Sequence, residues 1–287
     1  MRARIASARN RQVVWARRLR QRKYRHAERR FLVEGLQLIH MGLEGGHRPE
    51  LLFYCEELFA GPGAPAIWER CRAAGTTLVP VTAAVMATLS ERDTCAGLLG
   101  VFPFVEREPR DLALPAGAAL ALLLDRLQNP GNLGTLIRTA DAAGAAAVLV
   151  LEPGADLYDP TAVRATMGSL FSLPLVRGRD PAALLALVPA PDWQVLGADP
   201  HAGALWDLVD WPARLALVLG NEARGLSPDV RARVNSWVRL PMAGRAESLN
   251  VAVTGGILMY AWVGRAGGGS AAPRGTPDRA HCASGRS

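Results

Sequence analysis

The sequence predicts an α/β protein with two folded domains, and three observations lead to this prediction. The chain has 287 residues, of which 49% are hydrophobic and 21% are charged, so it can bury a substantial core. Short apolar segments alternate with helical segments over residues 31–105. Residues 118–265 contain continuous apolar runs instead, which are typical of a parallel sheet that helices cover on both faces.

Each domain is built from segments of this kind. In the first domain we expect strands at residues 31–33, 51–55, 77–81 and 98–104, and helices at residues 35–44, 64–74 and 82–89. In the second domain we expect strands at residues 119–124, 146–151, 194–197, 215–219 and 237–240. Residues 106–117, which hold charges, two prolines and a glycine, are predicted as the interdomain linker. The Gly-, Ser- and Pro-rich tail, residues 266–287, is predicted to be disordered.

Positive charge is concentrated at the N-terminus. Residues 1–30 hold 12 lysine and arginine side chains and one acidic residue, Glu28, whereas the rest of the chain carries a net charge of −4. A basic helix or arm over residues 9–30 favours a polyanionic partner, nucleic acid before an anionic membrane. A solvated, disordered tail is the alternative. The side chains that we expect to bind nucleic acid are Arg17, Arg18, Arg20, Arg22, Lys23, Arg25 and, in a later loop, Arg245.

Several classes of protein are excluded by what the sequence lacks. The longest uncharged apolar stretches, residues 112–124 and 251–263, have about 13 residues each, and a helix that spans a bilayer needs roughly 18. No GxGxxG follows a strand and no GxxxxGK[ST] occurs, which argues against dinucleotide-binding and P-loop proteins. With no CxxC, HExxH or GxSxG, neither a metal site nor a serine hydrolase is expected. Because the N-terminus has no apolar signal segment, we expect a cytoplasmic protein without a membrane partner.

The first segment that carries chemistry is LDRLQNPGNLGTLIRTADAAG, residues 124–144. A buried strand runs into an NPGN turn, and a helix is predicted to begin near Asn132, a good N-cap residue. Arg138 lies on this helix, off its apolar stripe, and therefore points towards the strand end, a partner or solvent. By spacing alone, an ordinary surface arginine is an equally good interpretation.

The second segment, LALVLGNEARGL, covers residues 215–226. Its buried strand ends at Gly220, where a glycine allows a ligand or another backbone to approach closely. Open α/β sheets bind ligands at such strand ends. Glu222 is therefore interpreted either as a cap of a tight turn or as a ligand-binding group, and we favour the ligand.

The third segment, LPMAGRAESLNVAVTGGILMYAWV, covers residues 240–263. A loop leads into a helix that is predicted to begin around Ser248 and is apolar almost all round, so it is either fully buried or part of a subunit interface. Gly255 and Gly256 inside it each lower helix propensity by roughly 1 kcal/mol. This cost predicts close backbone packing at the two glycines.

Together, NPGNLGTLIRTADAAG, LVLGNEARGL and LPMAGRAESLNVAV resemble the three ordered motifs of the SpoU/TrmH family of SPOUT RNA 2′-O-ribose methyltransferases. Upstream, FLVEGLQLIHMGLE resembles the start of the family's small RNA-binding domain, which is similar to ribosomal protein L30e. The resemblance covers about residues 10–265. It implies a SPOUT domain with a C-terminal deep trefoil knot, which is an exception to unknotted topology. It also implies S-adenosylmethionine as cofactor and a homodimer formed through the last helix.

The resemblance also implies functional residues. The implied active-site residues are Asn132, Arg138, Glu222, Ser248 and Asn250. The implied cofactor-binding residues are Gly220, Leu240 and Leu249, with Leu196, Gly197, Leu219, Met242 and Asn250 as neighbours. The family proposal makes Arg138 a general base, but a guanidinium is essentially always protonated. We expect Arg138 instead to bind a neighbouring phosphate and to stabilise charge on the 2′-oxygen, with Asn132 and Ser248 orienting the arginine and the ribose and Glu222 bracing the loop.

The implied substrate is RNA, and the family acts on both tRNA and ribosomal RNA. The L30e-like domain favours 23S rRNA. The arginine-rich composition and the RAESLN loop are similar to actinobacterial self-resistance methyltransferases, such as those for avilamycin and thiostrepton, which favours a uridine ribose and antibiotic resistance. The alternatives are a tRNA ribose methyltransferase and a non-catalytic RNA-binding or ribosome-assembly factor. The intact Asn132, Arg138, Glu222 and Asn250 argue against the non-catalytic factor.

Overall fold

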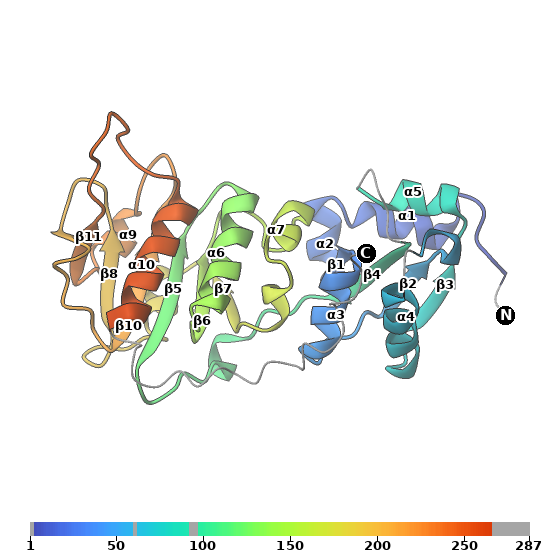
Figure 1. The fold of residues 1–287 in the computed structure, drawn as a ribbon, viewed down its shortest axis with the longest axis horizontal. Coiled ribbons are helices and arrows are strands. Elements are labelled where there is room, and N and C mark those ends of the chain that lie inside the picture. The colour runs from blue at the N-terminus through green and yellow to red at the C-terminus, as the bar shows by residue number, and fades with distance from the viewer. Residues whose placement is uncertain (1–2, 60–61, 92–96, 266–287) are drawn as a thin grey trace, which may run out of the picture.

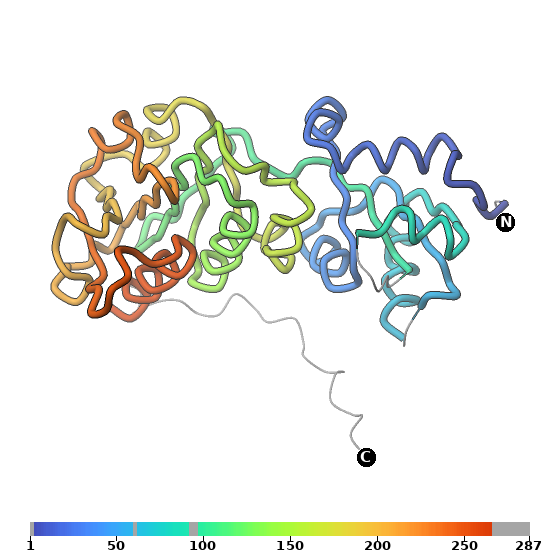
Figure 2. Tube along the Cα trace, turned by 90° about the horizontal axis from the view of Figure 1, so that it is seen from above, coloured from blue at the N-terminus to red at the C-terminus, as the bar shows by residue number. Residues whose placement is uncertain are grey.

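The computed structural model describes residues 3–59, 62–91 and 97–265. Figures 1 and 2 show two α/β domains that lie side by side along the longest axis of the molecule. The predicted disordered tail, residues 266–287, lies outside the described residues. No helix in the described ranges is both long and apolar enough to cross a membrane.

The N-terminal domain contains a four-stranded sheet in the order β1-β4-β2-β3. The strands are β1 (Arg30–Glu34), β2 (Leu51–Tyr54), β3 (Thr77–Pro80) and β4 (Leu98–Pro103). The helices that follow them are α3 (Leu36–Glu44), η1 (Glu56–Leu58), α4 (Gly63–Ala73) and α5 (Ala83–Leu89). The strands pair antiparallel except for β2 with β3. The predicted strands and helices of this domain are confirmed, with ends that differ by one residue.

The basic N-terminal segment folds onto this domain. It forms two short helices, α1 (Arg11–Arg18) and α2 (Arg22–Glu28), and Leu19 is the C-cap residue of α1. Val13, Ala16 and Leu19 are buried in one cluster with residues of α5 and the sheet. Apolar burial therefore makes residues 9–30 part of the small domain and not a solvated tail.

Three of the arginines expected to bind nucleic acid have partners within the protein: Arg20 and Arg25, which are at least partly buried, and Arg22, which stays exposed. The Arg25 side chain is only 2% exposed and donates to Asp156 of the second domain. Arg20 donates from Nη2 to the carbonyl oxygens of Leu89 and Ser90, at 2.7 and 2.8 Å, where α5 ends. Carbonyls at a helix C-terminus lack intrahelical partners, and a cation is favoured there. These contacts correct the expectation for Arg20 and Arg25, whereas Arg17, Arg18 and Lys23 are exposed.

The second domain is built on a seven-stranded parallel sheet in the order β7-β6-β5-β10-β8-β11-β9. Its strands are β5 (Ala119–Asp125), β6 (Ala147–Leu151), β7 (Leu175–Gly178), β8 (Gln194–Ala198), β9 (Ala204–Leu205), β10 (Arg214–Leu219) and β11 (Ser236–Arg239). The five predicted strands are confirmed. The sequence prediction missed β7 and β9, which are four and two residues long and lie at the sheet edges.

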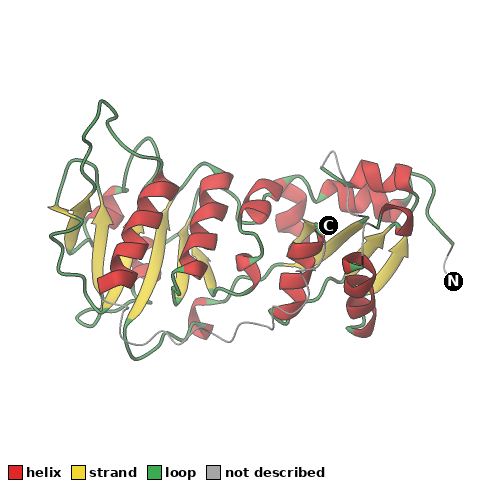
Figure 3. Ribbon diagram, in the orientation of Figure 1, coloured by secondary structure: helices red, strands yellow, loops and turns green. Residues whose placement is uncertain are grey.

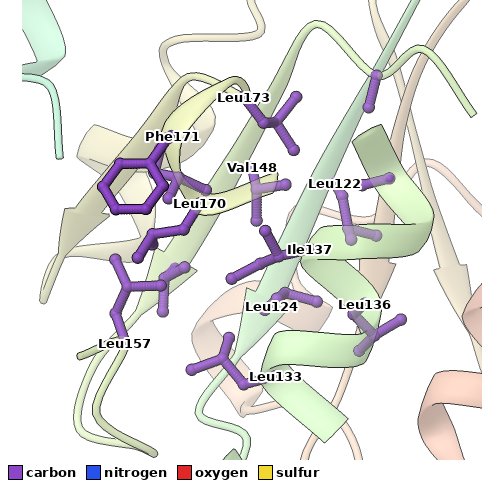
Figure 4. Packing of buried hydrophobic residues seen from close by; sticks show 14 of the residues in the cluster. Leu122, Leu124, Leu133, Leu136, Ile137, Val148, Leu157, Leu170, Phe171 and Leu173 are labelled. Carbon is purple, nitrogen blue, oxygen red and sulfur yellow. The ribbon is translucent and has the colours of Figure 1, made fainter. Parts of the chain in front are cut away.

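Helices cover both faces of this sheet, as the continuous apolar runs predicted. The helical elements are η2 (Pro109–Asp111), α6 (Pro130–Ala142), α7 (Pro160–Ala165), η3 (Ser169–Phe171), α8 (Pro181–Leu185), α9 (Pro228–Arg231) and α10 (Val251–Arg265). Alternate β5 residues point to opposite faces: Leu122 and Leu124 pack with α6, as Figure 4 shows, whereas Leu123 joins the other core. Helices α6 and α10 lie together on one face (Figure 3).

The two helices nearest the predicted site begin at other residues than expected. Asn129, not Asn132, is the N-cap of α6: its Oδ1 accepts hydrogen bonds from the N–H groups of Gly131 and Asn132. Helix α10 begins at Val251 instead of Ser248, because Asn250 Oδ1 accepts from the N–H groups of its first turn. In both places a side-chain oxygen binds helix N–H groups that have no intrahelical partner.

The two glycines of α10 differ in their surroundings. A Cβ atom on Gly255 would lie 2.4 Å from Leu136 Cδ2 and 2.6 Å from Leu219 Cδ1. At Gly256 the nearest atom, Thr139 Cγ2, would lie at 3.7 Å, an ordinary contact distance. Close packing is therefore confirmed for Gly255, which lets α10 approach α6 and β10, and it is wrong for Gly256.

This difference gives a matched pair of variants. We expect Gly255→Ala to lower the free energy of unfolding by about 1–3 kcal/mol because the added methyl overpacks the core. Gly256→Ala gains helix propensity without a clash, so we expect it to raise that free energy by up to about 1 kcal/mol. Urea denaturation at one fixed protein concentration measures both. Equal effects of the two substitutions would contradict this account of the packing.

Candidate active site

A cavity of about 550 Å³ opens at the carboxyl ends of β8, β10 and β11. Its wall begins where these strands end, at Ala198, Gly220 and Leu240, and the N-terminus of α10 completes it. Ligands of open α/β sheets bind at this edge, and the volume is that of a drug-sized or cofactor-sized ligand site. The cavity is therefore the candidate ligand site.

The loop after β10 folds back on itself at this edge. A Cβ atom on Gly220 would lie 2.4 Å from the carbonyl carbon of Gly225, so only glycine permits the turn. Asn221 and Gly225 exchange two main-chain hydrogen bonds of 3.0 and 2.9 Å. Asn221 also donates from Nδ2 to the carbonyl oxygen of Arg126 at the end of β5. This tight turn places Glu222 at the mouth of the cavity.

Glu222 joins the three sequence segments in one hydrogen-bond network. Its Oε1 accepts from Asn132 Nδ2 at 3.0 Å, and its Oε2 accepts from the Gln128 N–H at 3.1 Å. The Asn129 N–H also donates to Oε1, at 3.3 Å. Asn132 Oδ1 in turn accepts from Asn250 Nδ2 at 3.0 Å. The network therefore links the starts of α6 and α10 through the loop after β10.

The same contacts keep Glu222 ionised. Partial burial raises its pKa, but hydrogen bonds from the Asn132 side chain and from main-chain N–H groups outweigh burial, and the pKa lies below its ordinary value. Glu222 is thus an acceptor that orients donors, which agrees with the expected bracing role.

The structure brings most of the expected residues together. Those that line the cavity are Leu219, Gly220, Glu222, Leu240, Met242, Ser248, Leu249 and Asn250. Asn132 stands just outside the lining and reaches it through Glu222 and Asn250. Leu196 and Gly197 do not line the cavity, because they lie inside β8, where Leu196 is buried and a Cβ on Gly197 would meet the Trp237 ring. Ala198, the last residue of β8, takes that place.

Arg138 does not reach the cavity within one chain. It lies in the second half of α6, its side chain is exposed, and it is absent from the cavity lining. No ion pair or hydrogen bond ties its side chain to another described residue. Helix α10, whose outer apolar face is exposed, packs on α6 through Leu136 and Thr139, and Arg138 lies on another face of α6. The side chain of the expected catalytic arginine is therefore free to bind a partner outside this chain.

Sequence reasoning missed a charged pair in the wall. Asp199 follows β8, and its Oδ2 accepts from Arg231 Nη1 at 3.2 Å. The guanidinium of Arg231 lies 4.4 Å from the centre of the Trp237 ring. Partial burial raises the pKa of Asp199, but the His201 N–H and Arg231 outweigh burial and lower it. The signal in the sequence was the position of Asp199 two residues after the predicted strand 194–197.

The lining fits S-adenosylmethionine in size and chemistry. Leu219, Leu240, Met242 and Leu249 supply apolar surface, and Gly220 exposes main chain at the strand end. Carboxylates and guanidinium groups both occur in the wall, which suits a ligand that carries charges of both signs. Among the described residues no group of three His, Cys, Asp or Glu side chains is placed to hold a metal ion.

The fold and the site define the class: a two-domain α/β RNA methyltransferase with a cofactor cavity at the carboxyl edge of its parallel sheet. The chain belongs to the SpoU rRNA methylase family, whose model matches residues 119–260. Residues 10–100 match the MRM3-like substrate binding domain, which agrees with the helices α1 and α2 being part of that domain.

Relatives and solved structures extend the match over both domains. The 23S rRNA (uridine(2479)-2′-O)-methyltransferase of Streptomyces viridochromogenes is 33% identical over 266 residues, 90% of each chain. The 23S rRNA (guanosine(2553)-2′-O)-methyltransferase RlmP of Bacillus subtilis is 32% identical over 89% of this chain and 97% of its own. The AdoMet-bound rRNA methyltransferase of Sinorhizobium meliloti has a TM-score of 0.82 and 31% identity, covering 91% of this chain and 97% of that one. The SpoU methyltransferase AviRb of Streptomyces viridochromogenes, in complex with AdoMet, has a TM-score of 0.80 and 30% identity, covering 89% and 97%.

The Glu222 network predicts a pH dependence. Because the pKa of Glu222 is lowered in the folded state, its contribution to stability is fully present above its ordinary value of 4.5 and is lost as pH falls through the folded value. We expect the difference in free energy of unfolding between wild type and Glu222→Gln to be largest near neutral pH and to shrink below that value. Urea denaturation at several pH values measures it. Glu247→Gln, at an exposed position of the next loop, is the matched control and should show no such trend.

Proposed function

We propose that the protein transfers a methyl group from S-adenosylmethionine to a ribose 2′-hydroxyl of 23S rRNA. The observation that carries this proposal is the network of Glu222, Asn132 and Asn250, which joins the three family motifs at the mouth of a cofactor-sized cavity. The names of two relatives that match nearly their full length support 23S rRNA as the substrate. One of these names gives a uridine and the other a guanosine. We favour the uridine, because of the RAESLN loop.

The chain's own residues would position the reactants. S-adenosylmethionine, when bound, supplies an electrophilic methyl group. Leu219, Leu240 and Leu249 would exclude water from its surroundings, and Ser248 and Asn250 stand at the cavity edge where the ribose would enter. Holding the two reacting atoms in line is worth several kcal/mol, roughly 7–11 in the best oriented cases. Asn132 is fixed by partners on both sides, so its amide is preorganised.

We further propose that the enzyme works as a homodimer through α10. The exposed side chains Val253, Ile257 and Tyr260 form an apolar face on this helix, on the side away from its buried residues. Because α6 packs on α10, a second copy that covered this face would lie close to α6, the helix that carries Arg138. Arg138 would then bind a phosphate next to the target ribose and stabilise charge on the 2′-oxygen at the site of the other subunit. This arrangement is supported by the position of Arg138, which does not line the cavity of its own chain.

The knot, the location and the biological role are also proposals. Helix α10 packs on β10 and α6 at the middle of the sheet, although β11, the strand before it, lies near one edge. The chain must therefore return across the carboxyl edge, which supports a C-terminal trefoil knot. We place the enzyme in the cytoplasm, where ribosomal RNA is made. Methylation at a drug-binding nucleotide would confer antibiotic resistance, for which the RAESLN loop is the support.

The substrate is tested by methyl transfer from radiolabelled S-adenosylmethionine to unmodified 23S rRNA, 16S rRNA and tRNA. We expect one labelled 2′-O-methylribose in 23S rRNA. Arg138→Ala should lower turnover about 100-fold, and Arg138→Lys should restore little, because an ammonium cannot make the bidentate contact. Arg233→Ala, at an exposed arginine after α9, is the matched control. Label in tRNA alone would establish the tRNA alternative, and cofactor binding without transfer to any RNA would favour a non-catalytic factor.

The dimer is tested by Ile257→Asp. A carboxylate in the centre of the apolar face should give a monomer in light scattering and at least a tenfold loss of methyl transfer. Ala186→Asp, at an exposed position after α8 on the opposite side of the sheet, is the control and should stay dimeric and active. A monomeric Ile257→Asp protein with full activity would show that each chain works alone.

A further inference from the structure

The basic helix α2 is fixed to the methyltransferase domain by a buried ion pair. Arg25 donates to Asp156 Oδ2 from Nε at 3.0 Å and from Nη2 at 2.7 Å, and it donates from Nη1 to the carbonyl oxygen of Leu19 at 3.1 Å. His26 Nε2 lies 3.1 Å from Asp156 Oδ1. The side chains of Arg25 and Asp156 are 2% and 5% exposed. The pair therefore crosses the domain junction out of contact with solvent.

The Asp156 loop, residues 152–159, rests directly on the segment that leads to the active site. The Ala155 N–H donates to the carbonyl oxygen of Leu127 at 2.6 Å. A Cβ atom on Gly154 would lie 2.7 Å from that same oxygen, so the two segments are in close contact. Arg22 of α2 donates to the Gly154 carbonyl oxygen at 3.2 Å. Helix α2 thus contacts the loop through Arg22, Arg25 and His26.

The contact continues into the catalytic network without a gap. Leu127 is followed by Gln128 and Asn129, whose N–H groups donate to Glu222. Glu222 in turn binds Asn132, which binds Asn250. A continuous set of packed and hydrogen-bonded groups therefore runs from α2 to the cavity mouth.

The junction has a second rigid contact beside the linker. Tyr158 Oη accepts from the N–H groups of Val105 and Glu106 at 2.8 and 3.0 Å and donates to the Glu106 carboxylate. Burial and the neighbouring Glu106 raise the pKa of Tyr158 well above its ordinary value, so it keeps its proton. Arg177 donates to the same carboxylate at 2.9 Å. The first residues of the predicted linker are thus bound to the second domain and do not act as a hinge.

The outer surface of α1 and α2 is free to contact RNA. Arg17, Arg18 and Lys23 are exposed, and no carboxylate in the described part of the chain lies within ion-pair distance of them. Figure 1 shows α1 and α2 along the same edge of the molecule as the orange-red loop that precedes α10. The helices that carry the basic side chains and the loop whose Met242 and Ser248 line the cavity therefore lie toward the same edge in this view.

From this arrangement we propose that Arg25 and Asp156 are positioning residues for methyl transfer: they fix the RNA-binding surface of α1 and α2 relative to the cavity and so select which ribose is methylated. The inference rests on the proposed function. Apolar contacts alone allow domains to slide, whereas two charge-assisted hydrogen bonds from Arg25 Nε and Nη2 to Asp156 Oδ2 restrict the orientation. A buried ion pair adds little stability over apolar residues of similar volume, so fixing an orientation is the role that such a pair fills best.

The test replaces both partners with apolar side chains, in Arg25→Met/Asp156→Leu, because the pair of substitutions keeps the volume and leaves no unpaired buried charge. We expect the Kd for S-adenosylmethionine to stay within about twofold and kcat/KM on 23S rRNA to fall at least tenfold. Mapping should show label on riboses next to the wild-type target. Arg30→Gln/Glu50→Gln, which removes an exposed ion pair inside the small domain, is the matched control. It should leave both kcat/KM on 23S rRNA and the labelled ribose unchanged. A double variant with wild-type kcat/KM and a single labelled ribose would overturn the proposal.

A second measurement separates this inference from the proposed function. Spin labels at Gln12→Cys and Thr135→Cys, both exposed, report the distance between α1 and α6 in a chain whose Cys95 and Cys282 are replaced by serine. We expect a narrow distance distribution in the wild-type background and at least a twofold broader one with Arg25→Met/Asp156→Leu. If the wild-type enzyme labels no RNA, the proposed function fails, and a broadened distribution would still show that the pair holds the domains. An unchanged distribution would overturn the positioning role.

Discussion

The carboxylate of Glu222 is the group on which the arrangement of the site depends. It accepts main-chain N–H groups that lie just before α6, at the end of a helix where donors lack intrahelical partners and negative charge is favoured. It also accepts a hydrogen bond from Asn132 Nδ2. This fixes the orientation of the Asn132 amide, whose Oδ1 can only accept, and Asn250 Nδ2 supplies the donor. The turn after β10, the start of α6 and the start of α10 are therefore mutually determined. Cavity shape follows from this constraint, because all three segments form its rim or stand beside it.

The sequence predicted the strands well where burial is continuous and poorly where it is not. Strands such as Ala119–Asp125 are buried along their whole length and apolar as far as Leu124, a pattern that is typical of a sheet covered on both faces. The strand Leu175–Gly178 has two buried residues followed by Arg177 and Gly178, and an edge strand of this kind has no distinct pattern. The start of α6 was predicted three residues late, although Pro130 at the first helical position is a signal that the sequence contains.

The candidate site was predictable as a set of residues but not as an arrangement. Gly220, Glu222 and Asn250 follow strands or precede a helix, so their place at the cavity could be inferred from the pattern. The position of Arg138 outside the cavity could not, because it depends on how α6 and α10 pack beside the strand ends. The burial of Arg25 could not be inferred either, since its partner lies 131 residues away in the sequence and nothing local distinguishes this arginine from its neighbours. Long-range pairing of charges is decided by tertiary packing, which a single sequence does not reveal.

The docked N-terminal helices change what counts as an exchangeable module in this enzyme. A chimera that took the substrate-binding domain of a relative, joined at residues 106–117, would keep Asp156 and replace the helix that carries Arg25. Loss of one partner from a buried ion pair costs about 3–5 kcal/mol, a large part of the stability of an ordinary domain. A chimera meant to transfer RNA specificity would therefore have to exchange α1, α2 and the loop 152–159 together, although these segments are far apart in the sequence. Target choice in such an enzyme would evolve by paired changes on both sides of the junction more readily than by exchange of whole domains.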